Sequence, residues 1–119
     1  MTVQECYAAF GGNYDEVFSR LRTDDRIKRF LQMALNDASY QLLIDSIASG
    51  NVDEAFRAAH TLKGVCGNLS ITRFGESSTA LCEYLREKRV LDDKAMSMLP
   101  KVKEDYELTM NCIKQLLNG

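Results

Sequence analysis

The chain is short of the residues that interrupt regular structure and of those that bind metals. One proline and seven glycines among 119 residues leave few turn signals, which favours helices over a many-stranded sheet. A single histidine cannot supply the repeated Glu-x-x-His ligands of a dinuclear metal bundle. The four cysteines form no Cys-x-x-Cys pair, so a zinc site would need thiolates from distant segments. We therefore expect no metal site and four reduced thiols.

A bias of charge and a long apolar run are also missing. The 15 basic and 17 acidic residues are interspersed and give a net charge of −2, so no basic field attracts nucleic acid. No apolar run approaches the roughly 20 residues that span a bilayer. Residues 1–5 do not have the basic start and apolar stretch of a secretory signal. We expect a cytoplasmic monomer with neither nucleic-acid nor membrane partners.

The length and the apolar content suit one globular domain. The chain is 45% hydrophobic and 27% charged, which is ordinary for a globular protein. At this length it can bury a core without disulfides or metals. We therefore predict a single domain over residues 1–119.

Apolar residues recur at spacings of three and four in long stretches, which is typical of amphipathic helices. The first stretch starts at Thr23-Asp24-Asp25 and is interrupted or capped again at Asn36-Asp37. The others run from Val52 to about Leu69, from Phe74 to Leu85 after Thr72 as N-cap, and from Asp92-Asp93 to about Leu117. Pro100 either kinks the last helix or begins a new one.

Short breaks with clear end signals separate these stretches. Gly50 is predicted to end a helix in the left-handed conformation. Asn51 with Glu54, and Asn13 with Glu16, match the capping box that opens a helix. Four amphipathic helices joined by short loops predict an all-α, up-and-down antiparallel four-helix bundle over about residues 24–117. One or two short N-terminal helices over about residues 1–23 cover one end.

The helix that contains the only histidine has two distinct faces. At about 100° per residue, one sector lies opposite His60, is apolar and must face the core. It comprises Ala55, Ala58, Leu62, Val65, Cys66 and Leu69. His60 therefore points to solvent. The residues within about 60° of it are Phe56, Arg57, Lys63, Gly64 and Gly67.

The exposed face suits nucleophilic chemistry on phosphorus. A neutral imidazole nitrogen is a good nucleophile near neutral pH, and Lys63 can neutralise a phosphoryl group held on it. Each interior glycine costs about 1 kcal/mol relative to alanine, so Gly64 and Gly67 suggest that access matters more than helix stability. Phe56 offers an apolar contact to a docking partner.

Each of these residues also has a simpler explanation. A lone surface histidine usually has no function, and a lone lysine is a solvated charge. The two glycines could let a neighbouring helix approach. Phe56 could lie under the N-terminal segments and serve the core. The sequence leaves these alternatives open, although their joint occurrence is much less expected by chance.

Ala59-His60-Thr61-Leu62-Lys63-Gly64, followed by Gly67-Asn68-Leu69, resembles the signature of histidine-containing phosphotransfer (HPt) domains. The resemblance extends over about residues 24–117. It implies a four-helix bundle with His60 as phosphoacceptor, Lys63 as phosphate-supporting residue and Gly64 as the residue that gives access. Ser70 departs from the pattern, because many members have glycine after the Asn-Leu pair. Pro100 in the last helix is also unusual for such bundles.

The resemblance also implies partners and a role. Such domains accept phosphoryl groups from an aspartate of a response-regulator receiver domain and pass them to another receiver. They are not enzymes and have no kinase activity, and the receiver holds the Mg²⁺, so we expect no cofactor on this chain. We expect receivers, and a hybrid sensor kinase, as partners in two-component signalling. Phe56, Arg57 and Gly67 are expected to form the docking face for the receiver.

Other functions remain as alternatives. The chain could be the phosphorylated substrate domain of a chemotaxis-type histidine kinase, but it has no room for the ATP-binding domain. The dimerising domain of a sensor kinase typically has Glu-Leu-Arg-Thr-Pro after its histidine, whereas Thr-Leu-Lys-Gly follows His60. A metal or haem bundle lacks ligands. A non-phosphorylated helical interaction module is the last alternative.

Overall fold

The computed structural model describes all 119 residues and contains helices but no strand. The prediction of an all-α fold is confirmed. No helix combines the length and the apolar character needed to cross a membrane. The helices are α1 (Val3–Phe10), α2 (Tyr14–Leu21), α3 (Asp24–Leu35), α4 (Ser39–Ala48), α5 (Val52–Leu69), α6 (Thr72–Leu85) and α7 (Asp93–Asn118).

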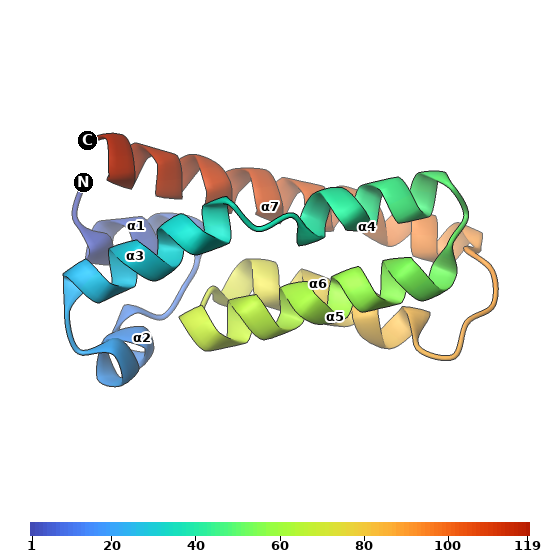
Figure 1. Cartoon of the computed structure of the whole chain (residues 1–119), viewed down its shortest axis with the longest axis horizontal. Helices are drawn as coiled ribbons and strands as arrows, with labels where there is room; N and C mark the ends of the chain where they lie inside the picture. Colours follow the sequence, from blue (N-terminus) through green and yellow to red (C-terminus); the bar gives the residue numbers. More distant parts are fainter.

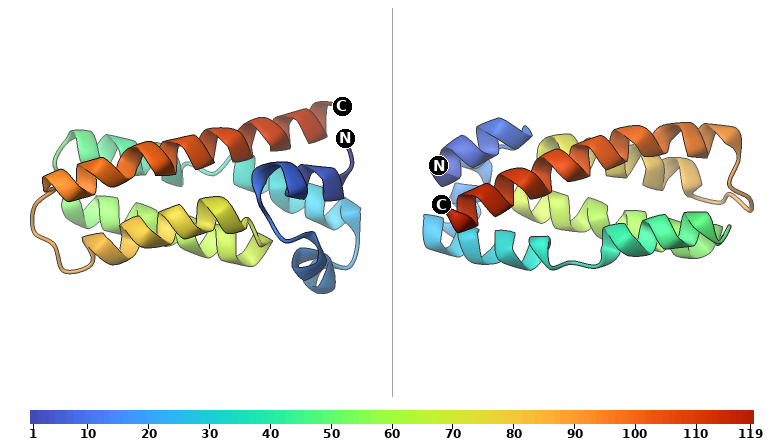
Figure 2. Two further views of the ribbon diagram at one scale, coloured as in Figure 1. Left: turned by 180° about the vertical axis from the view of Figure 1, so that it is seen from behind. Right: turned by 90° about the horizontal axis from the view of Figure 1, so that it is seen from above.

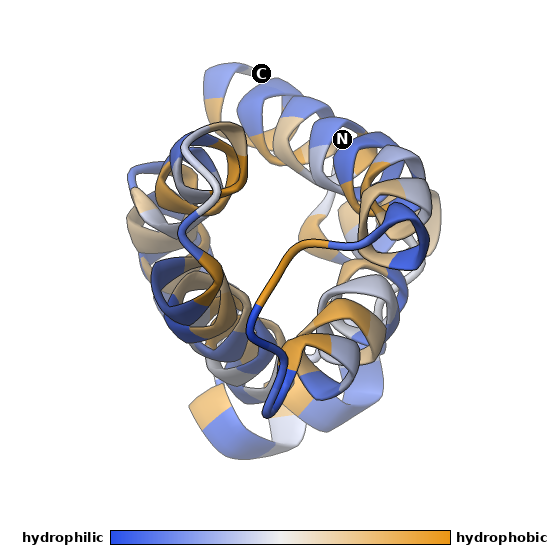
Figure 3. Cartoon of the chain, turned by 90° about the vertical axis from the view of Figure 1, so that its right-hand side faces the viewer, coloured by the Kyte–Doolittle hydropathy of each residue, from blue (hydrophilic) through white to orange (hydrophobic).

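The body is elongated, with α4, α5, α6 and α7 running alongside one another (Figure 1). Each of these helices contacts the next one along the chain. α3 lies roughly end to end with α4 and contacts α7, as the views from behind and from above show (Figure 2). Viewed end-on, the hydrophobic segments turn mainly toward the common axis (Figure 3). α5, which contains the only histidine, is thus held between α4 and α6.

The helix count exceeds the prediction because one predicted helix is divided. The stretch from residue 24 to residue 48 forms two helices, α3 and α4, separated by residues 36–38. Asn36 ends α3, and the Asp37 side chain then accepts a hydrogen bond from the Ser39 N–H at 2.8 Å. Asn and Asp side chains compete in this way with the helical backbone. The interruption at Asn36-Asp37 is therefore a complete break.

The helix starts follow the predicted residues, with three corrections. Asn13 and Asn51 each cap their helix by accepting the N–H of the residue three positions later. The other half of each capping box is missing, because the side chains of Glu16 and Glu54 bind elsewhere, to Ser70 and to Arg57. Thr72 is not an N-cap: it is the first residue of α6, after Ile71, which makes no side-chain cap. Gly50 has φ 74°, in the left-handed region as predicted.

Pro100 neither begins nor ends a helix, because α7 continues through it from Asp93 to Asn118. A proline has no N–H, so the carbonyl of Met96, four residues earlier, has no helical partner. Met96 is exposed, and water can satisfy that carbonyl. The second of the two predicted alternatives, a new helix at Pro100, is wrong.

All four cysteines, Cys6, Cys66, Cys82 and Cys112, are buried, and none forms a disulfide. Burial raises the pKa of the Cys6 and Cys66 thiols to about 12. The thiolate is the reactive form, so these groups act at neutral pH as small apolar side chains. They belong to one core that includes residues from all seven helices.

Candidate functional site

The face of α5 opposite His60 is buried almost as predicted. Ala55, Ala58, Leu62, Cys66 and Leu69 have at most 5% of their surface exposed. Val65 is the exception, because it is only partly buried and lines a groove of about 300 Å³ between α3 and α5. The burial of the remaining face fixes the rotation of α5 about its axis. That rotation directs His60 outward.

His60 lies at the middle of α5 and is exposed. Its ring centroid is 6.0 Å from that of Phe56, one turn earlier, and the two planes are inclined at 53°. Arg57 is exposed on the same side and pairs with Glu54, one turn before it. The imidazole is therefore open to another molecule and has an aromatic ring and a cation beside it.

Gly64 and Gly67 face open space. A Cβ atom built on either glycine would meet no heavy atom within 4 Å, apart from the helix's own nearby backbone. A glycine that allowed a close helix approach would have a neighbour at that distance, as Gly75 has in the Cβ of Cys66 at 3.0 Å. The alternative that these two glycines serve helix packing is therefore wrong. Because these glycines have no side chains, no atoms project from the helix surface beside His60 at these two positions.

Lys63 is one turn after His60 and is tied to a neighbouring helix. Its Nζ lies 3.2 Å from Oε1 of Glu83 on α6. The same oxygen lies 3.1 Å from the guanidinium of Arg86, the residue that ends α6. Arg86 in turn lies over the ring of Phe56, with 5.2 Å from Cζ to the ring centroid.

The sequence reasoning missed Glu83 and Arg86. Each is one charged residue among many, and neither has a motif around it. Only the antiparallel packing of α6 on α5 brings them to the side of the exposed face. Hydrogen bonds from Arg86, and then from Lys63, hold the pKa of the Glu83 carboxyl below its usual range.

Phe56 is not covered by the N-terminal helices. Its side chain is partly buried against the core, and the group over its outer face is Arg86. α1 and α2 lie at the opposite end of the body from the start of α5 (Figure 1). The alternative that placed Phe56 under the N-terminal segments is therefore wrong. The Phe56 ring therefore lies beside His60 on the exposed side of α5.

The C-terminal end of α5 is held by the N-terminal segment. The last carbonyls of a helix have no partner within it. Here the Tyr7 hydroxyl donates to the Leu69 carbonyl at 2.8 Å, and Arg20 donates to the Asn68 carbonyl at 2.8 Å and the Gly67 carbonyl at 3.3 Å. Residues 1–22 thereby stabilise the glycine-containing half of α5.

Ser70, the departure from the HPt pattern, belongs to the same network. Its φ of 54° lies in the left-handed region, where glycine is favoured. Its hydroxyl donates to Glu16 at 2.6 Å and accepts from Arg20 at 2.6 Å. These bonds offset the strain of a serine in this conformation. The turn therefore keeps a conformation typical of glycine, with a serine that ties α2 to α5.

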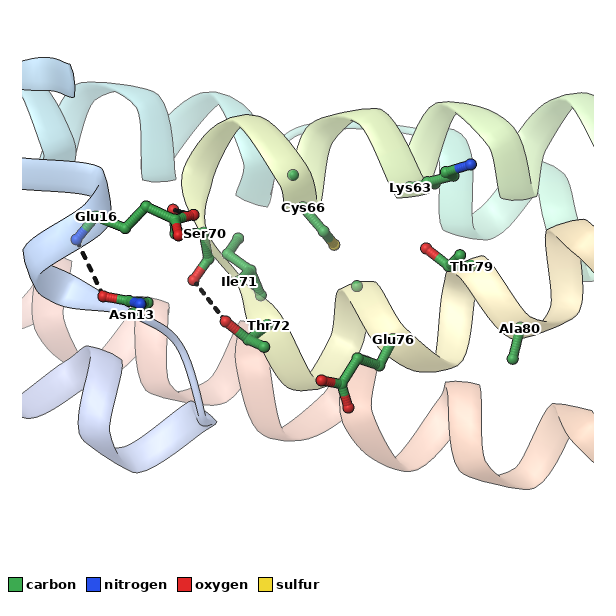
Figure 4. Close-up of a pocket in the computed structure, with 12 residues that line it drawn as sticks. Asn13, Glu16, Lys63, Cys66, Ser70, Ile71, Thr72, Glu76, Thr79 and Ala80 are labelled. Atoms are coloured by element: carbon green, nitrogen blue, oxygen red, sulfur yellow. Dashed lines mark hydrogen bonds between the residues drawn. The ribbon is translucent and has the colours of Figure 1, made fainter.

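A groove of about 670 Å³ runs along the α5–α6 side from this network toward the histidine face. Lys63 and Thr79 lie toward one end, Glu16 and Asn13 lie at the other, and Cys66 lies between them (Figure 4). Gly67 also lines the groove and leaves it open. No group of three or more His, Cys, Asp or Glu side chains in the chain is arranged to hold a metal ion.

The chain matches a known protein family. The family model of the Hpt domain matches residues 27–117. The match includes α5 with His60 and Lys63, and α6 with Glu83. Residues 1–26, which contain the partners of the α5 carbonyls, lie outside it. Comparison with curated proteins and with solved structures finds no match.

Proposed function

Because the chain belongs to the Hpt domain family, we propose that it is a phosphorelay intermediate that accepts a phosphoryl group on His60 from the aspartate of one receiver domain and passes it to another receiver. The observation that carries the proposal is the position of His60. It is the only histidine of the chain, lies within the family match, and is exposed midway along α5 beside two glycines that leave its surroundings open. We also assign α3 with α4, α5, α6 and α7 to the four members of an antiparallel bundle.

The transfer needs no group on this chain beyond an imidazole and its charged surroundings. The unprotonated ring nitrogen attacks the phosphorus of the receiver's aspartyl phosphate. An N–P bond forms as the bond from phosphorus to the aspartate oxygen breaks, and the electron pair leaves with the carboxylate. The proton on the other ring nitrogen stays in place. The reverse step returns the phosphoryl group to a second receiver, and no nucleotide is consumed on this chain.

The neighbours of His60 have roles that follow from their positions. Lys63 supplies positive charge to the phosphoryl oxygens. Gly64 and Gly67 let the receiver approach in line with the ring nitrogen. Phe56 and Arg57 are proposed as contacts of the docked receiver, with Phe56 as an apolar anchor. Mg²⁺, if the transfer uses it, belongs to the receiver.

The proposal is tested by incubating the purified chain with a panel of phosphorylated receiver domains. We expect label to move from at least one receiver to the chain, in a form that survives base and is lost in acid, as a phosphoramidate is. Base-labile label would indicate an acyl phosphate instead. No transfer from any receiver of the source cell would favour a non-phosphorylated interaction module.

Access to His60 predicts opposite results for two substitutions of Gly64. Gly64→Ala should leave transfer nearly unchanged and stabilise the helix by up to about 1 kcal/mol, because a Cβ there meets nothing. Gly64→Gln should keep the fold but block transfer, since the longer side chain lies over the approach to the imidazole. Unfolding curves and transfer rates on both variants check this. Normal transfer in folded Gly64→Gln would exclude the access role.

Phe56→Ala should weaken receiver binding by more than about 1 kcal/mol, as loss of a central aromatic anchor does. Because Phe56 is only partly buried, we also expect a stability loss of about 2 kcal/mol, less than for a fully buried ring. Phe18→Ala is the matched control, because Phe18 is 38% exposed on α2. Receiver affinity and denaturant unfolding are measured on both. A stability loss at unchanged affinity would show that Phe56 serves the fold alone.

A further inference from the structure

One carboxylate, that of Glu83, holds two cations beside the histidine face. Its Oε1 lies 3.2 Å from Nζ of Lys63 and 3.1 Å from the guanidinium of Arg86. Its Oε2 accepts from Nε of Arg86 at 3.3 Å. A single oxygen is thus shared by cations from two helices. Lys63 on α5 and Arg86 at the end of α6 meet only through this carboxylate.

Both cations also belong to the surroundings of His60. Lys63 lies one turn after it on the same helix. Arg86 lies 5.2 Å from the centroid of the Phe56 ring, which is itself 6.0 Å from the centroid of the His60 ring. One cation thus follows His60 by a turn of α5, and the other reaches its surroundings across the Phe56 ring. Both are engaged with Glu83 while no phosphoryl group is present.

These ion pairs can exchange partners. The side chains of Lys63, Glu83 and Arg86 are 40%, 49% and 48% exposed, and pairs so exposed are weak. The pKa of Glu83 is held below its usual range by Arg86 and Lys63, so the carboxylate is ionised at neutral pH. A phosphoryl group on His60 brings two further negative charges to this cluster. Three anionic oxygens and one carboxylate then compete for the same two cations.

We propose that Glu83 sets the phosphoryl-transfer equilibrium of His60 by holding Lys63 and Arg86 while the imidazole is free and by giving up Lys63 when the phosphoryl group is bound. The inference rests on the proposed function. Phosphorylation breaks the Lys63–Glu83 pair and leaves Glu83, with Arg86, near a dianion of the same sign. The phosphorylated chain is raised in free energy, which makes it a better phosphoryl donor to the next receiver.

Glu83→Gln removes the charge and keeps the shape and length of the side chain. In an equilibrium between phosphorylated receiver and this chain, the fraction of label on His60 should rise, with the equilibrium constant increasing about threefold, the size expected for a half-exposed pair. Glu83→Asp, which keeps the charge, should stay closer to the wild type. Arg86→Gln should shift the equilibrium the other way, because it removes a cation that supports the phosphoryl group.

The matched control is Glu104→Gln. Glu104 is exposed on α7 and takes part in none of the ion pairs of the chain. The Glu104→Gln substitution should leave the transfer equilibrium constant unchanged. Unfolding curves on each variant show that folded proteins are compared. A substitution that only lowers stability leaves the transfer equilibrium constant unchanged, provided that it is measured under conditions where the variant stays fully folded.

The outcomes separate this inference from the proposed function. If the wild-type chain takes no label from any receiver, the proposed function fails. If the wild type is labelled but Glu83→Gln matches Glu104→Gln, phosphotransfer stands and the role of Glu83 is overturned. A fall in the label on Glu83→Gln would also overturn it, because Glu83 would then be holding Lys63 in place for the phosphoryl group.

Discussion

His60→Gln is expected to abolish uptake of acid-labile label from a phosphorylated receiver and to leave the fold intact. The chain has no second imidazole, and the side chain of His60 is exposed, so no buried contact is lost. Substitutions at such surface positions usually change stability by less than about 0.5 kcal/mol. Glutamine keeps a polar group of similar reach without a nucleophilic ring nitrogen. The loss of transfer should therefore be complete, with unfolding curves that overlay those of the wild type.

The control for this result is receiver binding. The variant should bind the receiver with affinity close to that of the wild type, because it keeps Phe56 and Arg57, the proposed docking contacts. Unchanged binding without transfer assigns the chemistry to the imidazole alone. If His60→Gln still takes up acid-labile label, the acceptor is another residue and the assignment of His60 is wrong.

Deleting residues 1–22 is expected to destabilise the chain by at least about 5 kcal/mol, comparable to the whole stability of a small domain. The deletion removes Val3, Tyr7, Phe10 and Val17, which are at most 2% exposed, and loss of a single buried aromatic ring costs about 3–5 kcal/mol. It also removes the partners of the last α5 carbonyls. Denaturant unfolding of the deleted chain measures the effect.

Two point variants test whether the loss of stability comes from the buried side chains of the N-terminal helices and not merely from a shorter chain. Phe10→Ala should cost about 3–5 kcal/mol, because the ring is fully buried. Phe18→Ala, on an exposed position of the same segment, should cost under about 1 kcal/mol. A deleted chain that unfolds cooperatively within 1 kcal/mol of the wild type would show that α1 and α2 are dispensable. Residues 23–119 would then suffice for the fold.

The sequence predicts the parts of the fold that depend on local signals. Val52–Leu69 has a cap at Asn51, a left-handed glycine before it and a continuous apolar face, and the structure places α5 over that range. The predicted short helices over about residues 1–23 correspond to α1 and α2, but the bounds of α1 are not predicted, although Thr2 and Glu5 form a complete capping box in the structure. The Thr-x-x-Glu spacing was a signal that could have located it.

What the sequence could not show depends on contacts between distant segments. Glu16 has the spacing of a capping-box residue, yet its carboxylate binds Ser70, 54 residues later. The role of Glu83 requires the register of α6 on α5, which no local pattern encodes. Asp105, on α7, is 1% exposed and pairs with Lys101, although an aspartate is ordinarily found on the surface. In each case the surroundings of a charged side chain are set by the tertiary packing and cannot be read from the neighbouring sequence.

The packing of α1 on α7 has a consequence for the way the chain is made. α1 is made well before α7, but its apolar face, with Val3, Tyr7 and Phe10, is completed by that helix, which begins only at Asp93. At about 5–20 residues per second, roughly ten seconds of translation separate the two. During that time α1 can make only its contacts with earlier segments such as α2 and α3, and the side that packs on α7 stays uncovered. The hazard of aggregation therefore falls in synthesis rather than in the finished protein, and a chaperone that covers the first ten residues should raise the yield.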